Sequence, residues 1–234
     1  MEIDNFVEAI KELGISLNNK QLEQLDQYYH LLIEWNEKIN LTGITEKKDV
    51  YLKHFYDSLT LYKTIDLKKY ESICDIGTGA GFPGMVLKIV FPHLHVFLLD
   101  SLHKRIVFLK EIKEALQLQN LEIIEARAEE YSIENKEKFD IVTSRAVAPL
   151  PLLLEYSIPL VKINGYFIPM KAKIEEERRN LNKIMEKLDI SLEKEEIFTL
   201  PIEESTRTLL KFKKIKSTSS LYPRKYSEMK KRPL

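Results

Sequence analysis

Residues 74–84 read CDIGTGAGFPG, and this glycine-rich stretch decides the fold. It follows a short apolar run, ESICDI at 71–76, and precedes a predicted helix at 83–90. Glycine permits positive φ angles and lets a ligand approach the backbone, while Pro83 suits the first turn of a helix, where no N–H donor is needed. The stretch therefore predicts a ligand-binding turn between a strand and a helix.

The pattern of this turn allows three interpretations. It could bind either of two cofactors, or it could be a tight turn with no ligand. Residues 79–84 satisfy the G-x-G-x-x-G pattern of dinucleotide sites. Asp75, two residues before Gly77, extends the pattern to D-x-G-x-G-x-G, the form found in S-adenosylmethionine-dependent methyltransferases of the Rossmann-like class. A carboxylate pairs with the ammonium group of that cofactor but repels a pyrophosphate. Asp75, Gly77 and Gly79 are therefore candidate cofactor-binding residues.

Beyond the turn, short apolar runs alternate with helical stretches, which indicates repeated βαβ units and an α/β fold. The runs lack a period of two, as expected for strands of a parallel sheet that is covered on both faces. The sequence thus predicts a seven-stranded, mostly parallel sheet with helices on both faces. Its strands are expected at 71–76, 94–100, 121–126, 138–144, 165–171, 196–200 and 207–215, with a helix at 174–188 before the last two.

The first 70 residues carry helical patterns and no clear strand pattern. Apolar residues recur at spacings of three and four between Leu22 and Ile39, and shorter helices are expected at 4–13 and 49–65. We therefore expect three parts, which are an N-terminal helical cap at 1–69, the α/β domain at 70–216 and a basic, flexible C-terminal tail at 217–234.

Charge and composition limit the classes of protein to which this chain can belong. The chain has 36 Lys and Arg residues against 36 Asp and Glu residues, yet residues 207–234 hold ten Lys or Arg and one acid. Together with Tyr222 and Tyr226, this basic tail suits a nucleic acid, although a solvated terminus or another acidic surface fits as well. Cys74 is the only cysteine, which excludes an internal disulfide, and neither a signal peptide nor ~18 consecutive apolar residues are found. We expect a cytoplasmic protein with no membrane partner.

Residues at the carboxyl ends of the predicted strands are candidate ligand contacts, because ligands of open α/β sheets bind at that edge. Asp100 closes the second strand, where it would accept hydrogen bonds from ribose hydroxyls or cap the next helix. Ala128 and Glu129 follow the third strand and would face an adenine. Lys104 and Arg105 open the helix after Asp100 and are either phosphate contacts or ordinary exposed residues.

Seven segments, taken in order, resemble those of one known family. They read WNEKINLTGI at 35–44, KHFYDS at 53–58, DIGTGAGFPG at 75–84, LLDSLHKR at 98–105, RAEE at 127–130, SRAVA at 144–148 and MK at 170–171. In these segments the chain resembles the small-subunit ribosomal RNA methyltransferase G family, also called glucose-inhibited division protein B. The resemblance covers nearly the whole chain.

This resemblance implies a class I methyltransferase that transfers a methyl group from S-adenosyl-L-methionine to N7 of one guanine in 16S ribosomal RNA. The substrate would be the RNA or the small-subunit particle. Apart from the resemblance, we expect a monomer. Cofactor contacts are implied at Gly77, Phe82, Ala128, Glu129 and Arg145. No metal is expected, because the five histidines show no conventional ligand spacing.

His54 and Asp57 lie three residues apart, and therefore on one face of a helix. By pattern alone they form an ordinary surface pair, whereas the resemblance implies that they roof the mouth of the active site. There they would position the RNA base together with Arg145 and Lys171. Guanine N7 carries a lone pair and loses no proton, so no general base is needed and we assign no catalytic residue.

Two other functions remain open from the sequence. A nicotinamide-dependent oxidoreductase can use the same fold, although it would need a substrate domain that this chain has little room for. A non-catalytic RNA-binding protein with a relict cofactor site is the second alternative.

Overall fold

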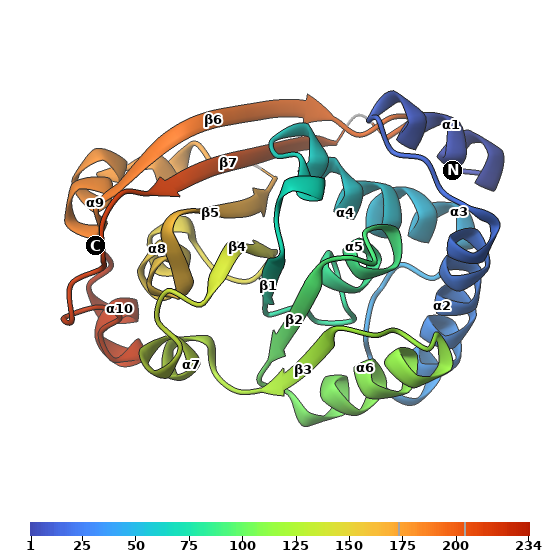
Figure 1. Ribbon diagram of the computed structural model, residues 1–234, viewed down its shortest axis with the longest axis horizontal. Helices are drawn as coiled ribbons and strands as arrows, with labels where there is room; N and C mark the ends of the chain where they lie inside the picture. The colour runs from blue at the N-terminus through green and yellow to red at the C-terminus, as the bar shows by residue number, and fades with distance from the viewer. Residues whose placement is uncertain (173, 204) are drawn as a thin grey trace.

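In a computed structural model that describes residues 1–172, 174–203 and 205–234, the chain is built around one seven-stranded sheet (Figure 1). The strands are β1 (Ser72–Ile76), β2 (His95–Asp100), β3 (Leu121–Glu125), β4 (Phe139–Arg145), β5 (Val161–Lys171), β6 (Ile190–Thr199) and β7 (Thr206–Lys214). Their order is β3-β2-β1-β4-β5-β7-β6. Strands β1 to β5 pair in parallel, and β7 runs antiparallel between β5 and β6. The expected α/β fold with a mostly parallel sheet is confirmed.

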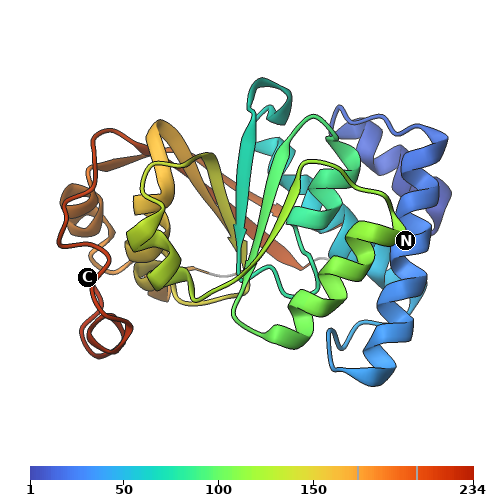
Figure 2. The same cartoon turned by 60° about the horizontal axis from the view of Figure 1, so that its bottom comes forward.

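Helices cover both faces of this sheet (Figures 1 and 2). One face carries α5 (Gly84–Val90) and α6 (His103–Ala115), and the other carries α7 (Ala128–Glu134), α8 (Leu150–Ser157), η4 (Ile158–Leu160), η5 (Glu176–Arg178) and α9 (Leu181–Leu188). Side chains of β1 alternate between the two cores, because successive strand residues point to opposite faces. Ile73 packs with α5 and α6, whereas Cys74 and Ile76 pack with α8 and α9.

The helical segment before β1 extends the core on the α5 and α6 face. It comprises α1 (Ile3–Glu12), α2 (Asn19–Lys38), α3 (Lys47–Val50), the π-helical η1 (Tyr51–Tyr56), α4 (Asp57–Leu59), η2 (Thr60–Lys63) and η3 (Leu67–Lys69). Phe6, Leu25 and Tyr28 are fully buried in the same core as Ile73. This helical segment therefore packs directly onto the sheet and shares one core with it.

The helix expected at 49–65 is divided into short pieces of different helical pitch. Ser58 Oγ donates to the His54 carbonyl, and Thr60 Oγ1 donates to the Asp57 carbonyl at 2.6 Å. Such side chains compete with the main chain for helical carbonyls, which bends or breaks a regular helix. The π-helical turn carries His54, and such turns occur frequently at functional sites.

Strand β6 departs most from the expected bounds, since it begins at Ile190 rather than at 196. The added residues include Glu193, Lys194 and Glu195, whose polarity hides the strand from a search for apolar runs. β6 forms one edge of the sheet. Charged residues on an edge strand discourage pairing with another chain. This strand therefore lacks the apolar pattern that marks the strands of the core.

The strand order reverses at β1, which lies between β2 and β4. Ile76 is in register with Leu99 of β2 and with Ser144 of β4, so the carboxyl ends of these three strands meet. Ligands of open α/β sheets bind in the crevice at such a point. The glycine-rich turn leaves β1 at this place.

The C-terminal residues differ from the expected flexible tail, because they fold back against α8. They include the short helix α10 (Tyr226–Lys231), in which Met229 is fully buried. Tyr222 and Leu234 pack against the same core. Across the described residues, no helix combines the length and the apolar content that crossing a membrane requires.

Candidate functional site

Two hollows lie next to each other at the carboxyl edge of the parallel strands. The first pocket, of about 350 Å³, is lined by the segments that follow β1, β2, β3 and β4, and by Tyr156 and Tyr226. The second pocket, of about 490 Å³, is lined by residues of η1, α4, β4, β5 and β7. Both volumes suit small organic groups. Ala146 lines both pockets, so groups held in the two can approach each other beside it.

The glycine-rich turn forms one wall of the first pocket. Gly77 has a φ of 65°, and its N–H donates to the Leu99 carbonyl at 2.7 Å. A Cβ on Gly77 would lie 2.7 Å from a methyl group of Val147. Gly81 has a φ of 99°, and a Cβ there would lie 2.6 Å from the Tyr28 hydroxyl. Both positions therefore require glycine, the first for the pocket and the second for contact with α2.

Asp75 lies beneath this turn and is fully buried. Its Oδ2 accepts hydrogen bonds from Thr78 Oγ1 at 2.6 Å and from the Gly84 N–H at 2.8 Å. Burial raises the pKa of Asp75 to about 7, although these two hydrogen bonds favour the charged form. Oδ1 has no hydrogen-bond partner within the described part of the chain. Asp75 thus holds the turn in shape with one oxygen and keeps the other oxygen available.

Asp100 lies at the end of β2, is nearly fully buried and lines the first pocket. Oδ2 accepts from the Gly79 N–H at 2.9 Å and from Arg105 Nη1 at 3.1 Å, and Oδ1 accepts from the Leu102 N–H at 2.9 Å. The carboxylate therefore links the glycine-rich turn to the start of α6. Both roles considered from the sequence, a ligand contact and a helix-start contact, are compatible with this position. Arg105, expected to touch substrate, instead pairs with Asp100.

Ala128 and Glu129 begin α7 and line the first pocket at the end of β3. This is the side on which an adenine was expected. Tyr156 of α8 and Tyr226 of α10 face the same pocket. The lining of the first pocket thus combines the glycine-rich turn with two aromatic rings.

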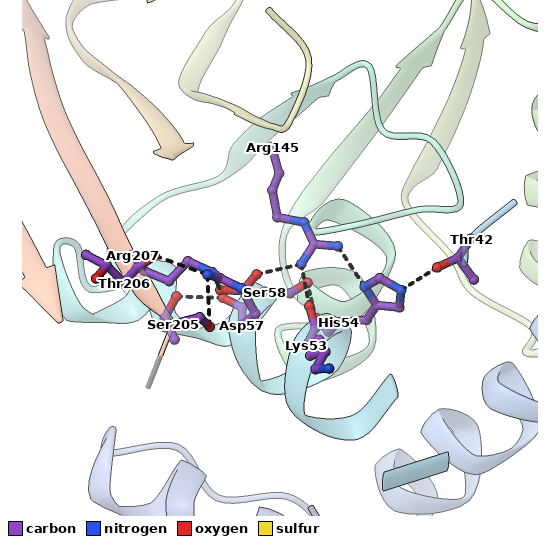
Figure 3. A network of polar contacts seen from close by, with 10 residues as sticks. Thr42, Lys53, His54, Asp57, Ser58, Arg145, Ser205, Thr206 and Arg207 are labelled. Atoms are coloured by element: carbon purple, nitrogen blue, oxygen red, sulfur yellow. Dashed lines mark hydrogen bonds and ion pairs between the residues drawn. The ribbon is translucent and has the colours of Figure 1, made fainter. Parts of the chain in front are cut away.

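Arg145 ends β4 and lines the second pocket. Nη1 donates to Asp57 Oδ2 at 2.8 Å and to the Lys53 carbonyl at 3.0 Å (Figure 3). The guanidinium carbon lies 5.3 Å from the centre of the Phe82 ring. This location favours a contact with substrate over the cofactor contact that the resemblance implies. Phe82, the other implied cofactor contact, lines neither pocket; it is 5% exposed and packs against Arg145 and His54.

His54 lies between Arg145 and Thr42 (Figure 3). Arg145 Nη2 donates to His54 Nδ1 at 3.2 Å, and His54 Nε2 lies 2.9 Å from Thr42 Oγ1. Because arginine can only donate, Nδ1 is an acceptor and the proton of the neutral ring is assigned to Nε2. Burial and the neighbouring guanidinium lower the pKa of His54 to about 3. The ring stacks on Phe82 with 4.3 Å between ring centres, and it stays neutral near pH 7.

Asp57 joins two arginines from different strands. It is buried, and it accepts from Arg145 through Oδ2 and from Arg207 Nε through Oδ1 at 3.0 Å. Two guanidinium groups beside one carboxylate leave a net positive charge at the second pocket. Figure 3 shows that these contacts connect the helical segment before β1 with β4 and β7.

Lys171 also lines the second pocket, where it donates to the Ala148 carbonyl at 3.0 Å and pairs with Glu177 at 2.8 Å. Lys104 is exposed and lines a separate hollow beside residues 37–41. The expected substrate residues therefore gather at the second pocket, except for Lys104 and Arg105. No cluster of three His, Cys, Asp or Glu side chains suited to a metal ion occurs in the three described ranges.

Comparison with known proteins identifies the family. A family model described as rRNA small subunit methyltransferase G matches residues 21–207. The chain belongs to this family. Relatives named ribosomal RNA small subunit methyltransferase G share 51% identity in Bacillus subtilis and 49% identity in Bacillus velezensis. Each comparison spans 237 residues and covers 100% of this chain and 99% of the relative.

Solved structures place this methyltransferase G family member within a wider fold. A SAM dependent methyltransferase from Aquifex aeolicus aligns with a TM-score of 0.51 at 18% identity, over 77% of this chain and 97% of that one. TYW2 of M. jannaschii in complex with AdoMet aligns with a TM-score of 0.51 at 19% identity, over 62% and 70%. At this identity the similarity shows the fold, which is that of class I methyltransferases.

The residues of the first pocket fit S-adenosylmethionine, the methyl donor of such methyltransferases. Asp100 presents a nearly fully buried carboxylate to this pocket, and Gly77 exposes its backbone to the pocket without a side chain, for which Val147 leaves no room. Asp75 lies beneath the glycine-rich turn and does not itself line the pocket, and its buried Oδ1 has no partner in the described residues.

Several residues that line the two pockets of this methyltransferase carry no functional signal in the sequence. Arg207 lies 150 residues from Asp57 and occupies an ordinary position of a strand pattern, so no local signal marks it. Glu177 falls in a charged run that reads as a solvated helix. Tyr226 stands out in the sequence only as an aromatic residue of the basic tail, for which a nucleic acid is one of the possible partners.

Proposed function

We propose that this protein transfers the methyl group of S-adenosyl-L-methionine to N7 of a guanine in 16S ribosomal RNA. The observation that carries the proposal is the pair of pockets that meet at Ala146. The first has the groups that an adenosyl cofactor needs, and the second is rich in hydrogen-bond donors. Membership of the methyltransferase G family supports small-subunit ribosomal RNA as the substrate.

In the first pocket, the carboxylate of Asp100 would accept hydrogen bonds from the ribose hydroxyls of the cofactor. Ala128 and Glu129 would contact the adenine, and Gly77 and Gly79 would let the cofactor approach the backbone. Asp75 would face the ammonium group with its unpaired Oδ1. These roles are supported by the burial, the turn geometry and the order of the strand ends.

In the second pocket, donors outnumber acceptors, which suits a guanine and its phosphate. The Hoogsteen edge of guanine presents the N7 and O6 acceptors. Arg145, Arg207 and Lys171 supply cationic donors, and His54 supplies a neutral ring. Donors that hold O6 and the phosphate leave the N7 lone pair free to react. Asp57 would act as a positioning residue, because it fixes two of these donors.

The reaction needs no proton transfer to the protein. The bound cofactor supplies an electrophilic methyl group on a sulfonium centre. The N7 lone pair would accept this methyl group directly, and the sulfur would keep the electron pair of the broken C–S bond, so no proton would have to move. The protein then acts mainly by alignment, which contributes up to roughly 7–11 kcal/mol in well-oriented systems. The target base must be unstacked to reach a pocket of this kind.

A methylation map tests the proposal directly. We expect N7-methylguanine at one position of 16S ribosomal RNA from cells that contain the protein, and its loss from cells that lack it. Purified protein with labelled S-adenosylmethionine should restore the mark on RNA or on small-subunit particles from the deficient cells. An identical map from both kinds of cell would refute the proposed function. The same assay compares naked RNA with the assembled particle.

The variant Gly77→Asp is expected to abolish cofactor binding in a folded protein. A carboxylate would enter the first pocket, and a Cβ would collide with Val147. Gly43→Ala is the matched control, because nothing lies within 4 Å of a Cβ at that position. Titration with S-adenosylmethionine and circular dichroism measure the two effects. Normal cofactor affinity in folded Gly77→Asp would remove the glycine-rich turn from the site.

The nicotinamide alternative is tested by the same titration with NADH, for which we expect no binding. A non-catalytic RNA-binding role is tested by the methyl-transfer assay. We further propose that the protein acts as a monomer in the cytoplasm, where its ribosomal substrate is found. Light scattering of the purified protein checks the monomer, with and without RNA.

A further inference from the structure

The C-terminal segment, residues 222–234, is fixed to α8 by a buried ion pair. Glu155 is fully buried, and Arg224 binds both of its oxygens, with Nε to Oε1 at 2.7 Å and Nη2 to Oε2 at 2.6 Å. The Arg224 main-chain N–H also donates to Oε1 at 3.0 Å. A two-pronged contact between arginine and carboxylate fixes both position and orientation. Nη2 further donates to the Arg232 carbonyl at 3.1 Å, which holds the far end of α10.

An apolar contact fixes the same segment from its other side. Met229 is fully buried in the core that contains α8 and α9, and Tyr222 and Leu234 pack against that core. Tyr226 lies two residues after Arg224 and three residues before Met229. Its place is therefore set by an ionic contact on one side and an apolar contact on the other.

Tyr226 lines the first pocket and keeps 40% of its surface exposed. Tyr156, which follows Glu155 on α8, and Glu129 in the first turn of α7 line the same pocket. Burial, followed by the nearness of Tyr226 and Glu129, raises the pKa of Tyr156. The exposed ring of Tyr226 thus lines the same pocket as Ala128 and Glu129, the residues proposed to contact the adenine.

We infer that Tyr226 forms a wall of the adenine subsite, so that the C-terminal segment is part of the cofactor site. An aromatic ring offers a flat, apolar face on which a purine can stack. The two contacts described above hold this ring in place before the cofactor arrives. The inference rests on the proposed cofactor pocket, and it adds a specificity residue that lies outside the strand-end loops.

The test compares Tyr226→Ala and Tyr226→Phe by calorimetric titration of the full-length chain. S-adenosylmethionine and 5′-methylthioadenosine are the two probes, because both carry the adenine and only the first carries the aminoacyl end. We expect Tyr226→Ala to weaken binding of both probes by about 5- to 10-fold, as for the loss of a stacked ring. Tyr226→Phe keeps the ring and should bind both within about 2-fold of the wild type.

The double variant Lys230→Ala/Lys231→Ala is the matched control, because both residues lie on α10 and neither lines the first pocket. It should bind both probes with wild-type affinity. Wild-type affinity in Tyr226→Ala would overturn the inference, as would an equal loss in the lysine control. If the wild type bound neither probe, the proposed cofactor pocket itself would be refuted. Point variants are preferred to a truncation, which would leave Glu155 buried without Arg224.

Discussion

Asp57 shows how one side chain can organise a polar site. Its carboxylate accepts hydrogen bonds from two arginines that come from strands β4 and β7. The neutral His54 completes the arrangement by accepting from the first of these arginines. Solvent alone would not fix the orientation of either arginine. The hydrogen bonds to the carboxylate hold both guanidinium groups in fixed directions.

Replacing Asp57 by Asn tests this role. We expect the free energy of unfolding to fall by about 1–3 kcal/mol, because two arginines lose a buried counter-charge. Methyl transfer should fall while the affinity for S-adenosylmethionine is unchanged, since Asp57 lies outside the first pocket. Denaturant unfolding and titration measure these quantities. Glu34→Gln, which breaks an exposed pair with Lys38, is the control and should change stability by about 0.5 kcal/mol or less.

The low pKa of His54, about 3, predicts a particular pH dependence. The unfolded ring takes up a proton below its ordinary pKa of about 6.5, whereas the folded ring does not until far lower pH. The stability linked to the neutral ring is therefore complete above pH 6.5 and is lost as the pH falls towards 3. We expect the stability difference between the wild type and His54→Asn to be largest at neutral pH and to shrink in acid.

Unfolding titrations at several pH values check this expectation. A stability difference that stayed constant from neutral to acidic pH would mean that His54 titrates normally. The single-turnover rate of methyl transfer should also show no ionisation of His54 near neutral pH. A sigmoidal rise of that rate near neutrality that disappears in His54→Asn would instead give His54 a catalytic role.

At the scale of elements, helix α2 supports the glycine-rich turn from outside the sheet. Tyr28 of α2 is fully buried and donates its hydroxyl proton to the Ala80 carbonyl. Burial raises the pKa of Tyr28 well above its usual value, so the hydroxyl stays protonated. Its ring stacks on both Phe55 and Phe82, each with 5.5 Å between ring centres, and these two rings also contact each other. The helical segment before β1 is thereby connected to the cofactor turn.

Tyr28→Phe removes this hydroxyl and leaves the ring. We expect about 1–2 kcal/mol of lost stability, because the Ala80 carbonyl loses a buried partner. The affinity for S-adenosylmethionine should fall by a few fold, since the turn becomes less fixed. Tyr29→Phe is the control, because that hydroxyl makes an exposed and longer contact of 3.3 Å with the Thr45 carbonyl. Equal effects of the two variants would contradict this account of α2.

The elements differ in how far the sequence specifies them. Helix α2 and the turn at 74–84 were predicted because their signals are local, an apolar spacing in one case and a glycine pattern in the other. Strand β6 was predicted only in part, since an edge strand tolerates charge. The second pocket could not be assembled from local patterns, because Arg207 reaches Asp57 only through the pairing of β7 with β5.

For the whole molecule, the numbers of acidic and basic residues are equal, but their charges are unevenly distributed along the chain. The C-terminal segment has one side that packs on α8 and another side that carries exposed cations. Those exposed cations are Lys225, Lys230, Lys231 and Arg232. They lie beside the cofactor pocket, so the same short segment can serve the cofactor with one side and a phosphate backbone with the other.

Replacing these four cations with alanine is expected to weaken RNA binding and leave cofactor affinity unchanged. The slope of log affinity against log salt should become shallower by roughly 0.7–0.9 for each phosphate contact that is lost. Filter binding at several salt concentrations measures the slope. A variant that loses four exposed lysines from the helical segment before β1 is matched in charge and should keep the wild-type slope. Its substitutions are at Lys11, Lys20, Lys68 and Lys69.

The position of Cys74 in β1, facing the core below the glycine-rich turn, has a chemical consequence. Its side chain is fully buried, and burial raises the pKa of the thiol well above the usual value. Peroxides and alkylating reagents attack the thiolate, so the folded protein resists both. Labelling requires the sheet to open, and its rate then reports how often β1 separates from its neighbours. The rate of Cys74 labelling therefore measures how often the sheet opens at the base of the cofactor turn. A bound ligand would lower this rate.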